Sequence, residues 1–426
     1  MRLSIVNGRV IDPAAGLDTQ AALHVADGRI ASIGPAPAGF VAQKTIDARG
    51  LVVAPGLVDL AARLREPGYE YKATLESEMQ AALAGGVTSL SCPPDTDPAL
   101  DEPGLVEMLK HRARGLDGAH LYPLGALTVS LKGEVITEMA ELAEAGCVGF
   151  SQAAHEILDT QVLLRAMQYA RTFGFTVWLQ PNDPYLGRGG VAHSGPVAAR
   201  LGLPGVPVIA ETVALQTIFE LVRSTDCRVH LCRLSSAAGI ELVRRAKAEG
   251  LPVSCDVAVH HLHLTDVDIG FFDSHYRVDP PFRAQRDRDA IRAGVADGTV
   301  DAICSDHTPV DDDAKQLPFA EAEAGTTGLE LLLPLTLKWA HETGQSLSAA
   351  LERITVRPAS VLGIDAGTLK PGALADVCVF DPAEHWVLER DRLLSQGKHS
   401  PYLGSELAGR TRLTLVAGRV VHSRPV

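Results

Sequence analysis

The sequence has no long uncharged apolar run and no excess of basic residues. No stretch approaches the roughly 20 apolar residues that a membrane-spanning helix needs, and Met1-Arg2-Leu3 leads directly into an alternating strand pattern. We therefore expect neither a membrane span nor a signal peptide. The chain carries 39 Lys and Arg against 52 Asp and Glu, and its formal net charge of −13 argues against nucleic acid or an anionic membrane surface as a partner.

The sequence also lacks any Cys-x-x-Cys pair, the spacing expected of a compact zinc site. Most of its seven cysteines lie in apolar, strand-like runs, and this odd number indicates reduced, buried thiols in a cytoplasmic protein. A zinc site at Cys227 and Cys232 is the less favoured alternative. The cysteines are Cys92, Cys147, Cys227, Cys232, Cys255, Cys304 and Cys378.

Length and composition fit one large domain and one small one, because 426 residues with 46% hydrophobic content can form a sizeable core. Short alternating strands with glycine turns occupy the first 53 residues. Asn7-Gly8 and Asp27-Gly28 are strong hairpin signals, since both central residues of a type I′ turn need positive φ. A weaker turn of this kind, Ala417-Gly418, lies near the other end. We predict a small β-sandwich domain formed by residues 1–53 and 365–426.

Between these ends, apolar strand-like runs alternate with helical segments such as Gln161–Phe173. This alternation favours a parallel sheet, and eight units indicate a closed (β/α)8 TIM barrel over residues 54–364. A doubly wound open sheet is the alternative, but no Gly-x-Gly-x-x-Gly follows the first strand. The expected strands are Leu57–Leu60, Thr88–Ser91, His120–Gly125, Cys147–Ser151, Thr176–Leu179, Arg228–Leu231, Pro252–Val257 and Asp301–Ser305.

The first expected barrel strand and the segment after it carry a family motif. Pro55–Asp59 followed by Leu64-Arg65-Glu66-Pro67-Gly68 resembles the corresponding part of the cyclic amidohydrolases, and of dihydroorotases in particular. Similar landmarks follow in the same order along nearly the whole chain, for example Asp47–Gly50, Gly202–Pro207 and Gly367–Gly372. Each landmark is weak alone, but together they are specific.

The resemblance implies a hydrolase that opens and closes a cyclic amide at the C-terminal mouth of the barrel. In that family, one or two zinc ions are bound by a His-x-His pair at the first strand. Further ligands are an acidic residue or carboxylated lysine after the fourth strand, a His after each of the fifth and sixth, and an Asp after the eighth. The zinc lowers the pKa of a bound water to near neutral, and the Asp handles its proton.

Nearly all of these ligand positions hold other residues in this chain. The first-strand pair is replaced by Ala61 and Arg63, and neither an alanine nor a guanidinium can donate a lone pair to a metal. After the fourth strand, Gln152 stands in a segment without a carboxylate. Gln180 aligns with the fifth-strand His, and Arg233 with the sixth-strand His. We therefore predict that no zinc is bound.

One ligand-type residue remains, in the segment Ser305-Asp306-His307-Thr308-Pro309. Asp306 alone is not expected to hold zinc, because catalytic zinc sites use three protein ligands. We predict that Arg63, Arg233 or both pair with Asp306 and fill the vacated space, since a buried carboxylate without a partner is unfavourable. His307 is expected to have a structural role.

The residues that would contact substrate are altered too. Pro94 and Asp279 each stand where the resemblance implies an asparagine. Arg65, which in the family would face the substrate carboxylate, is kept, and a salt bridge is its alternative role. The acidic segment Asp311–Ala324 has no clear period and predicts a mobile loop over the barrel mouth.

Two further histidine sites are not expected to bind metal. His230 should pack outside the barrel, because strand alternation points it away from Arg233. His260 and His261 should not share one ion, because adjacent residues of an extended segment face opposite ways.

The resemblance implies a catalytically inactive dihydroorotase homologue. In some bacteria such proteins accompany the catalytic chain of aspartate carbamoyltransferase in pyrimidine biosynthesis, and a homo-oligomer within that complex is expected. Two alternatives stay open. One is a working amidohydrolase with a site rebuilt around Asp306, His307 and Asp279. The other is a regulatory module in which the arginines at the mouth, Arg65 among them, bind a small dicarboxylate.

Overall fold

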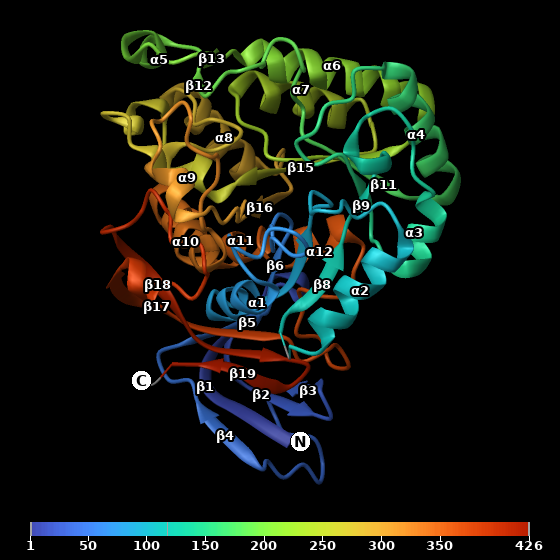
Figure 1. Ribbon diagram of the computed structural model, residues 1–426. Coiled ribbons are helices and arrows are strands. Elements are labelled where there is room, and N and C mark those ends of the chain that lie inside the picture. The colour runs from blue at the N-terminus through green and yellow to red at the C-terminus, as the bar shows by residue number, and fades with distance from the viewer. Residues whose placement is uncertain (1, 117, 425–426) are drawn as a thin grey trace.

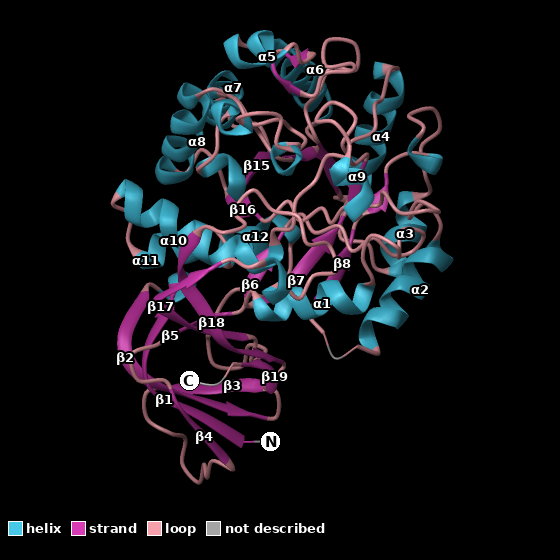
Figure 2. Cartoon of the chain, turned by 60° about the vertical axis from the view of Figure 1, so that its left-hand side comes forward, coloured by secondary structure: helices cyan, strands magenta, loops and turns pink. Residues whose placement is uncertain are grey.

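The structure is a computed structural model that describes residues 2–116 and 118–424. A β-rich domain formed by both ends of the chain packs against one side of a larger α/β barrel (Figure 1). The two termini lie together in the β-rich domain, and helices surround the barrel strands (Figure 2). The predicted fold class, a (β/α)8 barrel with a second β domain, is confirmed.

The barrel strands pair in parallel within two sheets, of order β6-β7-β8 and β9-β10-β11-β14-β15-β16. Only Leu124 separates β8 from β9, so these two act as one strand of the eight. A parallel bridge between Ala62 and His307 joins the other edges and closes the barrel. The strands are β6 (Leu57–Asp59), β7 (Val87–Cys92), β8 (His120–Pro123), β9 (Gly125–Ala126), β10 (Phe150–Ser151), β11 (Thr176–Leu179), β14 (Arg228–Leu231), β15 (Val253–Ala258) and β16 (Ala302–Cys304).

Helices cover the outside of the barrel, and local sequence signals set their ends. Thr74 caps the first of them as predicted, because its side chain accepts from the Ser77 N–H while the Ser77 side chain accepts from the Thr74 N–H. The helices are α1 (Leu75–Ala84), α2 (Pro103–Arg114), α3 (Met139–Ala145), α4 (Thr160–Phe173), α5 (Pro196–Leu201), α6 (Val208–Thr225), α7 (Ala237–Ala248), α8 (Gln285–Asp297), α9 (Asp312–Gln316), α10 (Leu332–Thr343), α11 (Leu347–Glu352) and α12 (Val356–Leu362). None of these described helices combines the length and apolar character needed to cross a bilayer.

The β-rich domain is one continuous eight-stranded sheet of order β19-β18-β17-β5-β1-β2-β3, with β4 paired to β1. The sheet curls until its two ends meet, since the N–H of Ile30 donates to the Ala373 carbonyl and that of Gly418 to the Ala375 carbonyl. Strands from both termini therefore share one core, as predicted. The strands are β1 (Arg2–Asp12), β2 (Leu17–Ala26), β3 (Arg29–Ile33), β4 (Lys44–Asp47), β5 (Val52–Pro55), β17 (Val377–Val387), β18 (Glu406–Val416) and β19 (Arg419–Ser423). A short pair, β12 (Ala192–His193) and β13 (Gly205–Val206), lies apart.

Strand alternation divides the side chains of the barrel between its interior and its helical cover. Val58, Leu60 and Trp178 pack in one interior cluster, whereas Leu57 and Leu179 pack in the large outer cluster with the helices. All seven cysteines are free; six are buried, and Cys232 is half-buried. The sulfur chemistry thus agrees with the buried thiols expected from the sequence.

The segment Asp311–Ala324 is not the featureless loop that its composition predicts. It contains α9, and the Lys72 ammonium donates to Glu323 Oε1 at 2.6 Å. Asp312 accepts from His399 Nε2 at 2.8 Å. These tertiary contacts order the segment. They cannot be predicted from the segment's own sequence, which is acidic and has no regular hydrophobic pattern.

Candidate functional site at the barrel mouth

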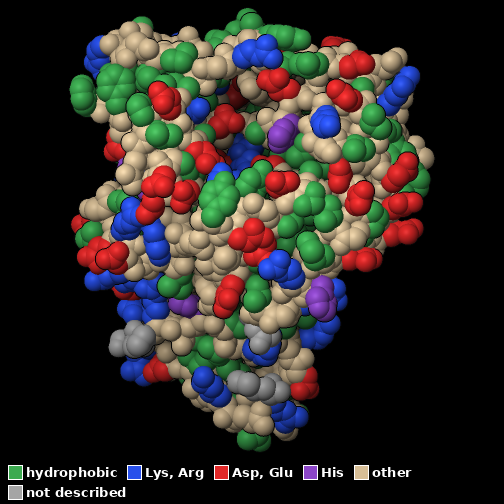
Figure 3. Space-filling view, in the orientation of Figure 1, with side chains coloured by type: hydrophobic (Ala, Val, Ile, Leu, Met, Phe, Trp, Pro, Cys, Tyr) green, Lys and Arg blue, Asp and Glu red, His purple; other side chains and the backbone are tan. Residues whose placement is uncertain are grey.

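The barrel mouth, where the C-terminal ends of the strands meet, holds a cluster of opposite charges. Figure 3 shows a hollow in the barrel part of the molecule, with basic side chains at its base and acidic ones around it. Loops after the parallel strands supply these side chains, as expected for a barrel of this class. Most of the residues predicted from the sequence to stand at metal-ligand positions lie here.

Arg233 and Asp306 form a direct, buried ion pair. Arg233 Nη1 donates to Asp306 Oδ1 at 3.0 Å, and the two side chains are 7% and 5% exposed. Arg233 Nη2 also donates to the side-chain oxygen Oε1 of Gln180, and Gln180 Nε2 donates to Asp279 Oδ2 at 3.3 Å. Burial alone would lower the pKa of Arg233, but neighbouring acidic groups, Asp306 first among them, together outweigh it and the pKa is raised. The predicted contact between Arg233 and Asp306 is confirmed.

Arg63 links Asp306 to a second carboxylate that the sequence-based prediction did not name as a site residue. Its Nε donates to Asp95 Oδ2 at 2.7 Å, and its Nη1 donates to Thr308 Oγ1 at 3.0 Å. The same Nη1 lies 3.8 Å from Asp306 Oδ1. Burial alone would raise the pKa of Asp95, but the neighbouring arginines, Arg63 first among them, together outweigh it and the pKa is lowered. In the sequence, the feature that could have predicted this ion pair is the acidic residue Asp95 directly after Pro94.

Arg65 is held at the edge of the mouth, away from the Asp306 carboxylate network. Its Nε donates to the Pro309 carbonyl at 2.9 Å, and its Nη2 lies 3.6 Å from Glu323 Oε1. Burial and then the neighbouring Arg63 lower the pKa of Arg65. This geometry corresponds to the salt-bridge alternative for Arg65.

The other predicted site residues serve backbone and loop contacts. Gln152 accepts from Thr128 Oγ1 at 2.9 Å and donates to the Leu131 carbonyl at 2.8 Å, so its amide is not in the arginine network. The Ala61 carbonyl accepts from the His307 N–H at 3.0 Å. Pro94 is buried beside Asp95. The structure therefore brings together five of the predicted residues: Arg63, Gln180, Arg233, Asp279 and Asp306.

His307 is fully buried, and both of its ring nitrogens are engaged. Nδ1 accepts from the Gly328 N–H at 3.0 Å, which leaves Nε2 as the donor to Glu78 Oε2 at 2.5 Å. Burial alone would raise the pKa of Glu78, but His307 and nearby serine hydrogen bonds together outweigh it and the pKa is lowered. The imidazole therefore ties the end of β16 to α1, which agrees with the structural role predicted for it.

The prediction that His230 packs outside the barrel is wrong. Its ring is fully buried against Trp178, with centroids 4.2 Å apart, and Nε2 lies 3.0 Å from Asp256 Oδ2. Trp178 belongs to the interior cluster, so His230 faces inward as well. Arg233 has φ of 56°, and this left-handed residue breaks the alternation on which the prediction relied.

His260 and His261 lie in the 3-10 helix η3 (Val259–Leu262), not in an extended segment as the prediction assumed. His261 is 5.0 Å from the ring of Phe282, and His260 is 5.8 Å from that of Tyr402. Burial lowers the pKa of His260 to about 3 and that of His261 to about 4. Both are therefore neutral in the folded protein at neutral pH.

These buried histidines predict acid destabilisation with a definite sign. Unfolding restores the pKa of His261 to about 6.5, so the unfolded chain binds the proton first as the pH falls. Between about pH 7.5 and about pH 5.0 this difference removes about 2 kcal/mol of stability. His261→Phe should remove that share of the pH dependence when urea unfolding is compared at the two pH values. If the difference in unfolding free energy between the two pH values is the same in the variant as in the unaltered protein, the assignment to His261 is contradicted.

The donor set around Asp306 does not fit a zinc ion. Two guanidinium nitrogens lie 3.0 Å and 3.8 Å from its Oδ1, and neither can bind a metal. Among residues 2–116 and 118–424, no three His, Cys, Asp or Glu side chains come together in an arrangement that could hold a metal ion. The mouth pairs the Asp306 carboxylate with arginines where the resemblance implies a cluster of metal ligands.

Comparisons with known proteins agree with this architecture. The family model for Dihydro-orotase-like proteins matches residues 50–238, and that for the Amidohydrolase family matches residues 206–422. A Pseudomonas aeruginosa protein named Dihydroorotase-like protein is 48% identical over 99% of this chain and 100% of its own length. A Geobacter metallireducens protein named Dihydroorotase is 38% identical over 100% of both.

The solved structure of L-hydantoinase (dihydropyrimidinase) from Arthrobacter aurescens has the same fold. Its TM-score is 0.89 at 24% identity, over 99% of this chain and 96% of that one. Identity this low shows the fold alone, whereas the full-length sequence relatives show the family. The chain therefore belongs to the dihydroorotase-like family of the amidohydrolases.

Proposed function

We propose that this protein is a catalytically inactive dihydroorotase homologue that binds no zinc. In this proposal it is a cytoplasmic structural subunit for the catalytic chain of aspartate carbamoyltransferase in pyrimidine biosynthesis, and it forms a homo-oligomer within that complex. The observation that carries the loss of catalysis is the buried network in which Arg63 and Arg233 occupy metal-ligand positions and pair with Asp306. The named partner rests on the family resemblance.

The arginine network also explains how the barrel could remain folded without a metal. An unpaired buried carboxylate would be strongly unfavourable. Here Asp306 receives a charge-assisted hydrogen bond from Arg233, and the second cation, Arg63, is balanced by Asp95. A barrel that is stable without a metal can still serve as a subunit that binds a partner protein through its surface.

The first alternative is a working hydrolase, and the Geobacter relatives named Dihydroorotase favour it. It needs a free group at the mouth to activate water. His307 is committed to Glu78 and Gly328, and Asp279 accepts from Gln180. His307 is therefore not free to serve as a general base, and Asp279 offers only an exposed carboxylate at the rim, so we favour the inactive homologue.

The second alternative, a dicarboxylate-binding module, needs cations that a ligand can reach. Each of the three arginines already faces a carboxylate: Arg63 pairs with Asp95, Arg233 with Asp306, and Arg65 lies near Glu323. A dicarboxylate would have to displace these partners. Calorimetry with carbamoyl-aspartate tests this alternative, and saturable binding would support it.

Purification of the tagged chain from its native host tests the main proposal. We expect aspartate carbamoyltransferase to co-purify through size-exclusion chromatography, without retained zinc and without hydrolysis of dihydroorotate. As a control, aspartate carbamoyltransferase from a strain lacking this chain should elute as a smaller species. Stoichiometric zinc together with turnover of dihydroorotate, and no associated carbamoyltransferase, would overturn the proposal in favour of the hydrolase.

A further inference from the structure

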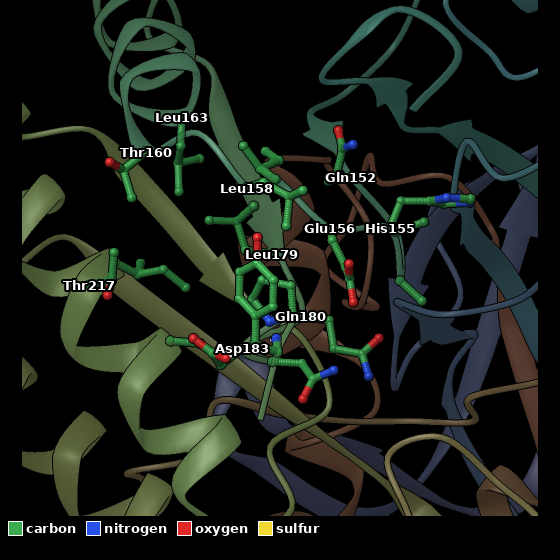
Figure 4. A pocket seen from close by; sticks show the side chains of 18 of the residues that line it. Gln152, His155, Glu156, Leu158, Thr160, Leu163, Leu179, Gln180, Asp183 and Thr217 are labelled. Carbon is green, nitrogen blue, oxygen red and sulfur yellow. Dashed lines mark hydrogen bonds between the residues drawn. The ribbon is translucent and has the colours of Figure 1, made fainter. Parts of the chain in front are cut away.

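A cavity of about 200 Å³ lies beside the arginine network, between the loops after β10 and β11 and the helices α4 and α6 (Figure 4). Its apolar lining includes Leu163 on α4, Leu179 at the end of β11 and Ile218 on α6. These three side chains are otherwise almost completely buried, so the cavity reaches the edge of the hydrophobic core. A ligand placed here would meet an apolar surface on one side.

The formally charged side chains that line the cavity are acidic. Glu156, Asp183 and Asp279 line it, and its lining contains neither lysine nor arginine. Asp183 Oδ1 accepts from the N–H groups of Tyr185 at 3.0 Å and Leu186 at 2.8 Å, which fixes this carboxylate in place. Figure 4 shows Glu156 reaching toward Gln180 and the middle of the cavity. Among the ion pairs of the described chain, none involves Glu156 or Asp183.

Charge and shape together select one class of ligand. In one alternative interpretation of the sequence, the arginines at the mouth bind a small dicarboxylate. The carboxylates around this cavity would repel such an anion. A cation gains from Glu156 and Asp183, and the apolar side of the cavity requires a hydrophobic group on that cation. The volume lies below the roughly 300–1,000 Å³ typical of sites for drug-sized molecules, so the ligand is small.

We propose that this cavity binds a small amphipathic cation, a primary or secondary amine that carries a compact hydrophobic group. The ammonium lies between Glu156 and Asp183, and the hydrophobic group contacts Leu163, Leu179 and Ile218. This site shares Gln180 and Asp279 with the edge of the Asp306 network, but it does not depend on the proposed companion role. It gives the protein a means of responding to a metabolite other than the substrates of its family.

Three ligands of matched shape test the charge requirement on the full-length protein by calorimetry. Phenethylammonium is the cation, 2-phenylethanol its neutral counterpart and 3-phenylpropanoate its anionic counterpart. We expect the ammonium to bind at least about tenfold more tightly than the alcohol, a difference of about 1.4 kcal/mol, and the carboxylate not to bind. Equal binding of amine and alcohol, or no binding of the amine at about 10 mM, would overturn the proposal.

Matched variants locate the site and separate it from general attraction to an acidic protein. Glu156→Gln should weaken phenethylammonium binding about tenfold and leave 2-phenylethanol binding unchanged. Glu144→Gln makes the same charge change at an exposed position of α3 outside the cavity, and should have no effect. Ala214→Trp should block the cavity and abolish binding of both ligands. An equal loss in Glu144→Gln, or full binding in the folded Ala214→Trp protein, would contradict the assignment.

Discussion

Arg233→Met is expected to destabilise the protein by about 3–5 kcal/mol, because it leaves the Asp306 carboxylate buried beside a weaker partner. The Arg233–Asp306 contact at 3.0 Å is the shorter of the two guanidinium contacts to Asp306, and both side chains are nearly inaccessible. Methionine retains much of the arginine side chain's length but removes the charge. Urea unfolding at neutral pH, with the slope checked for two-state behaviour, measures the loss.

A second substitution separates the lost charge from lost packing. Asp306→Asn removes the carboxylate and keeps a residue type that tolerates the positive φ of 48° at this position. The double variant should therefore recover most of the stability that Arg233→Met loses. Arg223→Met is the surface control, since its partners are exposed, and should lose no more than about 1 kcal/mol. If Arg233→Met loses no more than this control, the network is not what holds the mouth together.

Restoring histidines should restore zinc binding. In the fourfold variant Ala61→His, Arg63→His, Gln180→His and Arg233→His, Asp306 keeps its carboxylate and gains four imidazole neighbours. Three protein ligands suffice for a zinc site, so we expect the variant to retain close to one equivalent of zinc after dialysis. The unaltered chain should retain none, and elemental analysis of both proteins gives the comparison.

A matched variant shows whether imidazole or merely the loss of arginine is responsible. Leucine at the same four positions also removes both guanidiniums but supplies no donor atom. It should retain no zinc although it opens the same space. A fourfold histidine variant that is folded by circular dichroism yet binds no zinc would show that these positions no longer converge on Asp306. Zinc retained by the unaltered chain would contradict the proposed metal-free site directly.

Much of the architecture could be predicted from the residues themselves, and the family resemblance predicted the loss of the metal ligands. The alternation of strands and helices predicted the barrel, and the hairpin signal Asp27-Gly28, which joins β2 to β3, predicted a β domain. The hairpin predicted at Asn7-Gly8 is wrong, because these residues lie within β1, where the positive φ of Asn7 accompanies a shift in the pairing with β2. Whether a side chain has a lone pair to donate is fixed by its chemistry, so Ala61 and Arg63 could be excluded as ligands without a structure. The pairing of Arg233 with Asp306 followed from the unfavourable energy of a lone buried carboxylate.

Only the tertiary structure decided which groups share the mouth and which way they face. Asp95 is brought to Arg63 by two separate strand ends, and no local pattern reports that distance. His230 and Arg233 both face inward because Arg233 adopts a left-handed φ, which a strand pattern does not encode. The cavity that we propose to bind an amine likewise exists because α4 and α6 are adjacent. Residue chemistry and periodicity are local properties, whereas these contacts are set by backbone dihedrals and by packing between distant segments.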